Sequence, residues 1–210
     1  MSERAPAVPP HPDLDVRSSV IGFKRYLRVD TIRFRHRLFS GEWSGERTFD
    51  VLRRGEAVAV VLYDPDRDQV VLIEQFRLAP WLSGSSPWQL EAPAGMVDAG
   101  ETPEAVAVRE TGEETGLVPI GDPVPIQRYL PTPGGSDEGL SLFCCRIDAS
   151  AAGGIHGLAT EQEDIRIAVK TVAEIETLLD AGAIENGHTL VGLYWLLRHR
   201  DRLRRDWARR

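Results

Sequence analysis

The chain comprises 210 residues, of which 42% are hydrophobic and 27% are charged, and its formal net charge is −7 at pH 7. This balance is typical of one globular domain with a sizeable core, and the net negative charge argues against general nucleic-acid binding. No apolar run reaches about 18 residues and no signal-peptide pattern is present, so neither membrane insertion nor secretion is predicted.

The first part of the chain is predicted to be a leader followed by strands. Residues 1–15 contain four prolines and are predicted to form a flexible leader. Residues 16–55 are predicted to form an antiparallel strand region. Within it, Arg28–Phe39 and Arg47–Arg53 alternate apolar and polar residues, as a strand with one solvated and basic face does. The Gly41–Gly45 turn between these strands favours a hairpin.

Residues 56–210 are predicted to form the main domain. This region starts with two almost continuously apolar core strands, Ala57–Tyr63 and Gln69–Gln75, joined by a turn rich in aspartate. A helix follows at Pro103–Thr115. The elements predicted after it are strands near Ile126–Leu130, Leu140–Ile147 and Asp164–Val169, a helix near Val172–Ala181, and a last helix from about Thr189. Strands outnumber helices, which favours an α+β sandwich around a mixed sheet.

The cysteines and histidines form no disulfide or metal-ligand pattern. Cys144 and Cys145 are adjacent in an apolar run, which indicates core packing in a reduced cytoplasm. His156 and His188 have no metal-ligand spacing to another histidine or cysteine and are predicted to be ordinary loop residues.

The helix at Pro103–Thr115 carries the most informative pattern. Thr102 is its predicted N-cap and Gly116 its predicted C′ residue. Three carboxylates fall on one face because helical neighbours are three and four residues apart, and they are Glu110, Glu113 and Glu114. Like charges at this spacing repel, and they also lie at the end where the helix dipole disfavours anions. The cluster is either a solvated acidic face or a site for a hard divalent cation such as Mg²⁺ or Mn²⁺.

The residues around this helix favour the cation site. The chain matches the pattern Gly-x5-Glu-x7-Arg-Glu-U-x-Glu-Glu-x-Gly-U, where U is aliphatic, at Gly95, Glu101, Arg109, Glu110, Glu113, Glu114, Gly116 and Leu117. This pattern resembles the signature of the Nudix hydrolases, which implies a Nudix-type α/β/α sandwich for residues 56–210. Thr111 stands where that family usually has an aliphatic residue, a departure that concerns helix packing and leaves the chemistry intact.

Other segments resemble the ADP-ribose pyrophosphatase branch of that family. They are Val71–Arg77, Glu91–Gly95, Pro133–Glu138 and Glu161–Ile165. The resemblance implies cleavage of ADP-ribose, a small nucleoside diphosphate sugar, into AMP and ribose 5-phosphate. It also implies a homodimer in which residues 16–55 provide dimerisation and substrate contacts. The alternatives are a pyrophosphatase for GDP-mannose or another nucleotide sugar, and a Nudix module that binds nucleotides without catalysis. The intact glutamates of the helix argue against loss of catalysis.

The resemblance also implies roles for individual residues. The expected metal ligands are Glu110, Glu113, Glu114 and the backbone carbonyl of Ala94, with Mg²⁺ as the expected metal and Mn²⁺ as the alternative. Arg109, directly beside Glu110, is not expected to share its face. Arg109 is instead expected to pair with Glu101 or another carboxylate and hold the helix on its loop, and Glu101 is expected to have the same structural role.

The general base is expected on a late loop, where Glu161 matches the family's base better than Glu163 does. Arg54 and Arg77 are the principal candidates for substrate binding, because guanidinium groups pair with phosphate and stack on adenine. The remaining candidates for substrate contact are Glu91 and Glu138. For the two arginines and the two loop glutamates, the alternative is an ordinary solvated surface residue.

Overall fold

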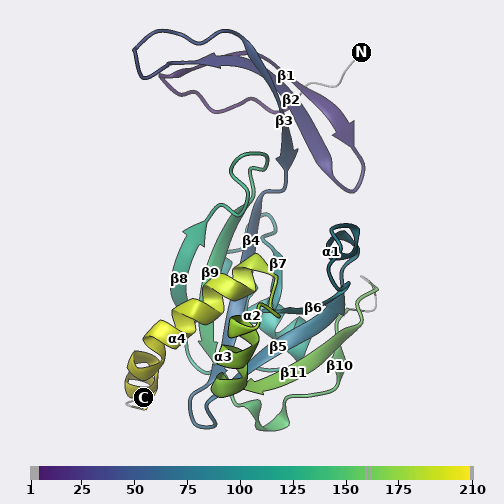
Figure 1. Ribbon diagram of the computed structural model, residues 1–210, viewed down its shortest axis with the longest axis vertical. Coiled ribbons are helices and arrows are strands. Elements are labelled where there is room, and N and C mark those ends of the chain that lie inside the picture. The colour runs from purple at the N-terminus through teal and green to yellow at the C-terminus, as the bar shows by residue number, and fades with distance from the viewer. Residues whose placement is uncertain (1–4, 159, 161, 209–210) are drawn as a thin grey trace. The chain divides into compact units, whose positions relative to one another are not determined.

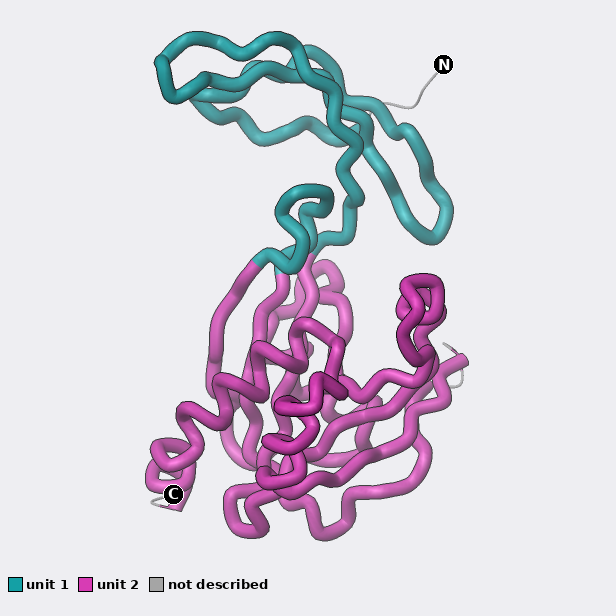
Figure 2. The backbone as a smooth tube through the Cα atoms, in the orientation of Figure 1, with its two compact units in different colours: residues 1–55, 130–139 teal, residues 56–129, 140–210 magenta. Residues whose placement is uncertain are grey.

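The computed structural model describes residues 5–158, 160 and 162–208. The chain divides into two compact units (Figure 2). The first unit extends to Gly55 and includes Leu130–Gly139, and the second contains Glu56–Tyr129 and the chain from Leu140 onward. Within the described residues, no helix combines the length and the apolar character needed to cross a membrane.

The first unit is built on an antiparallel sheet in the order β1-β2-β3 (Figure 1). The strands are β1 (Leu14–Lys24), β2 (Arg28–His36) and β3 (Arg47–Arg53). The predicted hairpin of β2 and β3 is confirmed. Strand β1 lies mostly in the strand region predicted at residues 16–55, but it was not predicted as a separate strand, because register shifts between Val16 and Ser18 and between Ile21 and Phe23 interrupt the alternation of its residues. It also begins inside the predicted leader.

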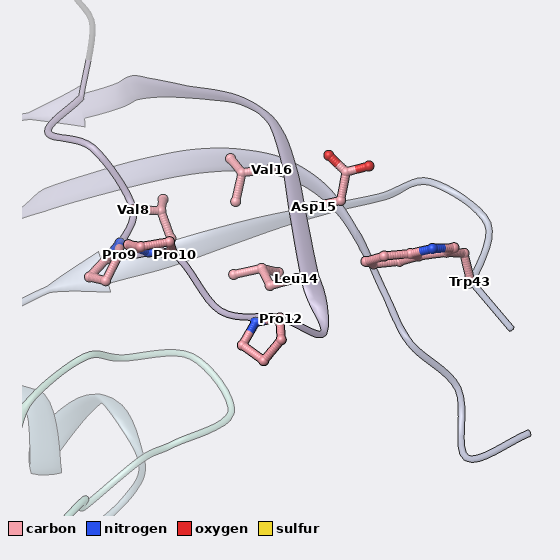
Figure 3. Close-up of a pocket in the computed structure, with 8 residues that line it drawn as sticks. All are labelled: Val8, Pro9, Pro10, Pro12, Leu14, Asp15, Val16 and Trp43. Carbon is pink, nitrogen blue, oxygen red and sulfur yellow. The ribbon is translucent and has the colours of Figure 1, made fainter. Parts of the chain in front are cut away.

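The proline-containing segment before β1 packs beside that strand and Trp43. Together they line a pocket of about 460 Å³ (Figure 3). The guanidinium groups of Arg35 and Arg37 lie 4.9 and 4.7 Å from the centre of the Trp43 ring, in cation–π contact. The segment at residues 8–12 therefore lines the same pocket as the start of β1.

A buried ion-pair network joins this sheet to the loop at residues 130–139. The fully buried Asp30 carboxylate accepts hydrogen bonds from Arg28 and Arg53. Arg53 also donates to Asp137 at 2.6 Å, and Asp137 accepts the backbone N–H of Arg54 at 2.7 Å. A buried carboxylate is stable only when charged donors satisfy it, so this network holds the loop at the end of β3.

The second unit contains a mixed sheet in the order β10-β11-β5-β4-β9-β8, with β6 paired to β5 and β7 paired to β4. The strands are β4 (Glu56–Asp64), β5 (Gln69–Phe76), β6 (Trp88–Glu91), β7 (Ala94–Met96), β8 (Val124–Tyr129), β9 (Gly139–Arg146), β10 (Ile155–His156) and β11 (Ile165–Thr171). The helices are α1 (Leu78–Leu82), α2 (Pro103–Thr115), α3 (Val172–Asp180) and α4 (Gly187–Trp207), with a 3₁₀ turn at Ala149–Ala151.

Helices cover both faces of the sheet. Val58, Val60 and Leu62 of β4 pack in one buried cluster with Val106 and Ala107 of α2. The alternate residues of β4 pack on the opposite face with α3 and α4 (Figure 1), in a cluster that includes Val61, Tyr63, Ile175, Leu193 and Leu196. Because both faces of β4 are buried, its sequence is continuously apolar. The predicted α+β sandwich is confirmed.

Several predicted boundaries and assignments need correction. α1, β6 and β7 were not predicted, because each is only three to five residues long, and a proline lies within α1 and next to each strand. Strand β10 lies in a segment where no strand was predicted, and α4 begins at Gly187 after the N-cap Asn186. The assignment of His156 and His188 to loops was therefore wrong: His156 lies in β10 and His188 in the first turn of α4. Cys144 and Cys145 are buried and free, so the prediction of core packing is confirmed.

Candidate active site

The ends of α2 are set by local interactions, as the sequence predicts. The Thr102 hydroxyl accepts a hydrogen bond from the Ala105 backbone N–H at 3.2 Å, and Pro103 occupies the first helical position. Gly116 ends the helix in the left-handed region at φ 69°, and its N–H donates to the Gly112 carbonyl at 2.8 Å. The turn that carries the three glutamates is therefore the last turn of the helix, directly before the Gly116 cap.

Two of the three helix carboxylates are buried beneath strand β7. Glu110 is 8% exposed and Glu114 is 3% exposed, whereas Glu113 is partly exposed. A Cβ atom on Gly95 would overlap the Glu110 carboxylate, so only glycine allows the strand to pass there. The next backbone position, Ala94, donates its N–H to Oε2 of Glu114 at 2.9 Å. The close approach of the β7 backbone thus explains why the pattern requires glycine at this position.

Arg109 bridges the carboxylates of α2 and the preceding loop. It donates from Nε to Glu101 at 3.0 Å, which confirms the predicted pair. Its NH1 also donates to Glu110 at 2.8 Å and to Glu113 at 2.9 Å. The expectation that Arg109 would not share a face with Glu110 was therefore wrong, because the long side chain folds back across the turn. This single guanidinium holds the helix on its loop and offsets the repulsion between two glutamates.

Burial makes ionisation of the Glu114 carboxyl unfavourable. Burial raises the pKa of the Glu114 carboxyl to about 8; the hydrogen bond from Ala94 opposes this rise, and the negative charges of Glu110 and Glu163 add to it. Burial also raises the pKa of Glu110, and Arg109 partly offsets that effect. By contrast, the hydrogen bond from Arg109 lowers the pKa of Glu101. Burial disfavours the charged form of both carboxyl groups, so a cation bound between them would strongly stabilise their ionised form.

The donor set fits a hard divalent cation. Carboxylate oxygens are preferred by Mg²⁺, which proteins usually hold with one or two carboxylates while the substrate's phosphates complete the shell. No group of three or more histidine, cysteine, aspartate or glutamate side chains converges as an assembled cation site among the residues that the structure describes. Arg109 engages Glu110 and Glu113 instead. The buried pair of Glu110 and Glu114 therefore fits a cation whose remaining ligands come with the substrate.

Arg77 lies directly after β5 and is held by a buried carboxylate. Its NH2 donates to Oε2 of Glu91 at 2.9 Å, and Glu91 is only 4% exposed. Gln75 and Asn186 also donate to Glu91, each at 3.1 Å. Protein donors thus surround the Glu91 carboxylate, which gives it the role of holding Arg77. The positive charge of Arg77 also lowers the pKa of Glu114, against the larger effect of burial.

Comparison with known proteins identifies the family. A family model described as the NUDIX domain matches residues 53–186. The chain belongs to the Nudix family. The Gly95–Leu117 segment is accordingly its Nudix motif, and α2 is its Nudix helix.

Similar proteins point to one branch of the Nudix family. The chain is 39% identical over 196 residues to the ADP-ribose pyrophosphatase of Escherichia coli strain K12, which covers 93% of each chain. It is 38% identical over 200 residues to the ADP-ribose pyrophosphatase of Haemophilus influenzae, covering 94% of this chain and 92% of the other. A GDP-mannose pyrophosphatase from Citrobacter koseri is 33% identical over 152 residues, which is 70% of this chain and 76% of the other.

A solved structure supports the Nudix fold. The crystal structure of an ADP compounds hydrolase superimposes with a TM-score of 0.68 at 17% identity, covering 96% of this chain and 97% of that chain. At this identity the likeness concerns the fold.

The first unit brings together Arg54 and Glu138, which were both predicted to contact the substrate. Arg54 donates from Nε to Glu138 at 3.4 Å. Their neighbour Asp137 accepts the backbone N–H groups of Arg54 and Gly55. The sequence reasoning did not single out Asp137, although it lies in the Pro133–Glu138 segment that resembles the ADP-ribose branch. Asp137 fixes the backbone from which Arg54 projects.

The loop with the candidate bases is described in part. Glu161 lies outside the described residues. The Glu163 carboxylate accepts the Leu158 backbone N–H at 3.0 Å. The charge of Glu163 also raises the pKa of both Glu110 and Glu114, so its side chain acts on the carboxylates of the Nudix helix.

Proposed function

We propose that this protein hydrolyses the diphosphate of ADP-ribose to AMP and ribose 5-phosphate in a reaction that requires Mg²⁺, with Mn²⁺ as an alternative metal. The observation that carries the proposal is the buried pair of Glu110 and Glu114 under the β7 backbone of an intact Nudix motif. Full-length similarity to ADP-ribose pyrophosphatases exceeds the similarity to GDP-mannose pyrophosphatases in both identity and coverage. This comparison supports ADP-ribose as the substrate.

The proposed metal ligands are Glu110, Glu113, Glu114 and the carbonyl of Ala94. When bound, a divalent cation neutralises diphosphate charge and lowers the pKa of a coordinated water. Glu110 and Glu114 provide the buried negative charge that retains the cation, while Arg109 and Glu101 keep the helix at a constant distance from its loop.

The remaining steps fall to residues that touch the substrate or the attacking water. Arg77, oriented by Glu91, pairs with a phosphate oxygen. Arg54 contacts the substrate, with Glu138 beside it. Glu161 accepts a proton from the attacking water as general base. The water oxygen forms a bond to one phosphorus of the diphosphate, the bond from that phosphorus to the bridging oxygen breaks, and the other phosphate leaves with the bridging oxygen. Glu163 assists from the same loop.

A substrate panel tests the proposal. The protein with Mg²⁺ should release a nucleoside monophosphate from ADP-ribose with a kcat/KM at least about tenfold above that for GDP-mannose and ADP-glucose. A higher kcat/KM for GDP-mannose would instead assign the protein to the alternative nucleotide-sugar activity. Tight binding of ADP-ribose without monophosphate release would support a non-catalytic module.

Mg²⁺ binding should release a proton from Glu114. In the metal-free protein this carboxyl has a pKa of about 8 and is mostly protonated at pH 7, whereas a metal ligand must be ionised. The apparent Mg²⁺ affinity should therefore rise by up to about tenfold per pH unit below pH 8 and level off above it. Titration calorimetry in two buffers of different ionisation enthalpy should report close to one proton released at pH 7. A heat independent of the buffer would contradict this assignment, and Glu114→Gln is the control that should release none.

We further propose that the protein is a cytoplasmic homodimer in which Arg54 or its neighbours serve the partner's site. Basic strands and exposed aromatic side chains of the first unit support an interface there, with Tyr26 93% exposed and Phe23 49% exposed. Light scattering should give about twice the chain mass of 23.3 kDa. A mass near 23.3 kDa at working concentration would refute the dimer.

Subunit mixing tests whether the site is shared. Arg54→Ala and Glu114→Gln homodimers should each be impaired, and mixing them should restore activity, because the hybrid contains one site with both residues intact. Mixing Glu110→Gln with Glu114→Gln should restore none, since both residues belong to the same chain's helix. Equal behaviour of the two mixtures would place Arg54 in its own chain's site.

A further inference from the structure

His156 packs against the end of the Nudix helix and has no part in the chemistry described above. A Cβ atom on Gly116 would lie only 2.7 Å from Cε1 and 3.1 Å from Nδ1 of His156, so the imidazole ring rests on the Gly116 backbone. On its other side, Nε2 lies 2.9 Å from the Gly153 carbonyl oxygen. A carbonyl only accepts, so Nε2 carries the hydrogen. The ring is thus held between two backbone segments that are far apart in the sequence.

The chain directly after His156 contacts Glu163 through Gly157 and Leu158. His156 is the last residue of β10 and pairs with Ile165 of β11. Gly157 follows at φ 103°, and a Cβ atom there would lie 2.6 Å from the Cβ of Glu163. The Glu163 carboxylate accepts the Leu158 N–H at 3.0 Å, and the Glu163 N–H donates to the Leu158 carbonyl at 3.3 Å. Leu158, two residues after His156, is therefore hydrogen-bonded to Glu163 in both directions.

The contact of the imidazole with Gly116 places His156 against the end of the Nudix helix. Gly116 follows Glu114 by two residues and is fixed by its own hydrogen bond to Gly112. Glu163 acts electrostatically on Glu110 and Glu114. His156 therefore lies at the point where the rigid end of α2 meets the strand that starts the loop.

We infer that His156 is a positioning residue, which sets the distance between the carboxylates of the Nudix helix and the contact of Leu158 with Glu163. The inference rests on the proposed function in one respect, namely that Glu161 or Glu163 acts on the attacking water. A displacement of about 1 Å can cost a catalytic group up to about 10²-fold in rate. A residue that acts through the loop should affect kcat, and it should leave substrate affinity to Arg77 and the other binding groups.

The variants are His156→Ala, His156→Gln and Ile155→Ala. His156→Ala removes both the ring and its hydrogen bond and should lower kcat about tenfold, with KM for ADP-ribose and the Mg²⁺ dependence within about twofold of wild type. His156→Gln keeps an N–H donor near the Nε2 position and should recover part of the loss. Ile155→Ala is the matched control, because this neighbouring side chain is exposed, lies on the same strand and should leave kcat within about twofold.

A double-mutant cycle separates positioning from general loosening of the fold. His156→Ala is combined with Glu161→Gln and, separately, with Glu163→Gln. If His156 acts through the loop, its tenfold effect should shrink to less than about twofold in whichever background loses more kcat. Multiplicative losses in both backgrounds, or a wild-type kcat for His156→Ala, would overturn the inference. So would full activity of both glutamine variants, because the loop would then hold no group to position. The proposed function is judged independently, by whether the wild-type protein turns over ADP-ribose.

Discussion

Replacing Glu114 by glutamine is expected to lower kcat by about 10²-fold or more and to leave the fold intact. Glutamine has nearly the same shape and can still accept the Ala94 N–H through its carbonyl oxygen, but it cannot carry the charge that retains a divalent cation. Steady-state kinetics across a Mg²⁺ titration measure the effect. Glu104→Gln, on the exposed first turn of the same helix, is the control and should behave as wild type.

The same substitution should stabilise the metal-free protein at alkaline pH. The folded pKa of Glu114, about 8, lies above its ordinary value of 4.5. Its contribution to stability is therefore greatest below pH 4.5 and is lost as pH rises to about 8, where the buried carboxylate must ionise. Glutamine never ionises, so the melting temperature of Glu114→Gln without metal should exceed that of wild type at pH 9.

In the kinetic experiment, an unchanged kcat of Glu114→Gln together with normal metal dependence would overturn the assignment of Glu114 as a metal ligand.

The second large effect is expected from Glu161→Gln, which should reduce kcat by about 10²–10⁴-fold and leave KM close to wild type. General-base catalysis contributes a factor of this size, and other groups hold the substrate. Glu163→Gln should cost less. If Glu163 ligates a metal that arrives with the diphosphate, excess Mg²⁺ should partly restore Glu163→Gln but not Glu161→Gln. Glu176→Gln, an exposed glutamate on α3, provides the control.

The two loop variants also define the outcomes that contradict this assignment. Full activity of Glu161→Gln with an inactive Glu163→Gln would exchange the two roles. Full activity of both would exclude the loop as the source of the base, and Glu138 would be the next residue to replace.

The sequence alone determined the features that depend on neighbours within a few residues. The bounds of α2 follow from Thr102, Pro103 and Gly116, whose capping interactions span no more than four residues. The core strands β4 and β5 were evident because burial on both faces makes them continuously apolar. The Nudix motif likewise lies on one continuous segment. Its spacing therefore sufficed to predict the family and the helix face.

Only the tertiary structure decided which of those residues are buried and what they contact. Helical spacing made Glu110, Glu113 and Glu114 equivalent, and the β7 backbone, passing at Gly95, buried the first and the last of them. Strand β1 was not predicted as a separate strand within residues 16–55, because its irregular register interrupts the alternation of apolar and polar residues.

Long-range contacts produced the remaining differences between prediction and structure. Asp137 reaches Arg54 across 83 residues of sequence, and His156 meets Gly116 through the pairing of β10 with β11. Such contacts leave no periodic trace in the sequence, because they depend on where distant elements are brought together by packing of the core.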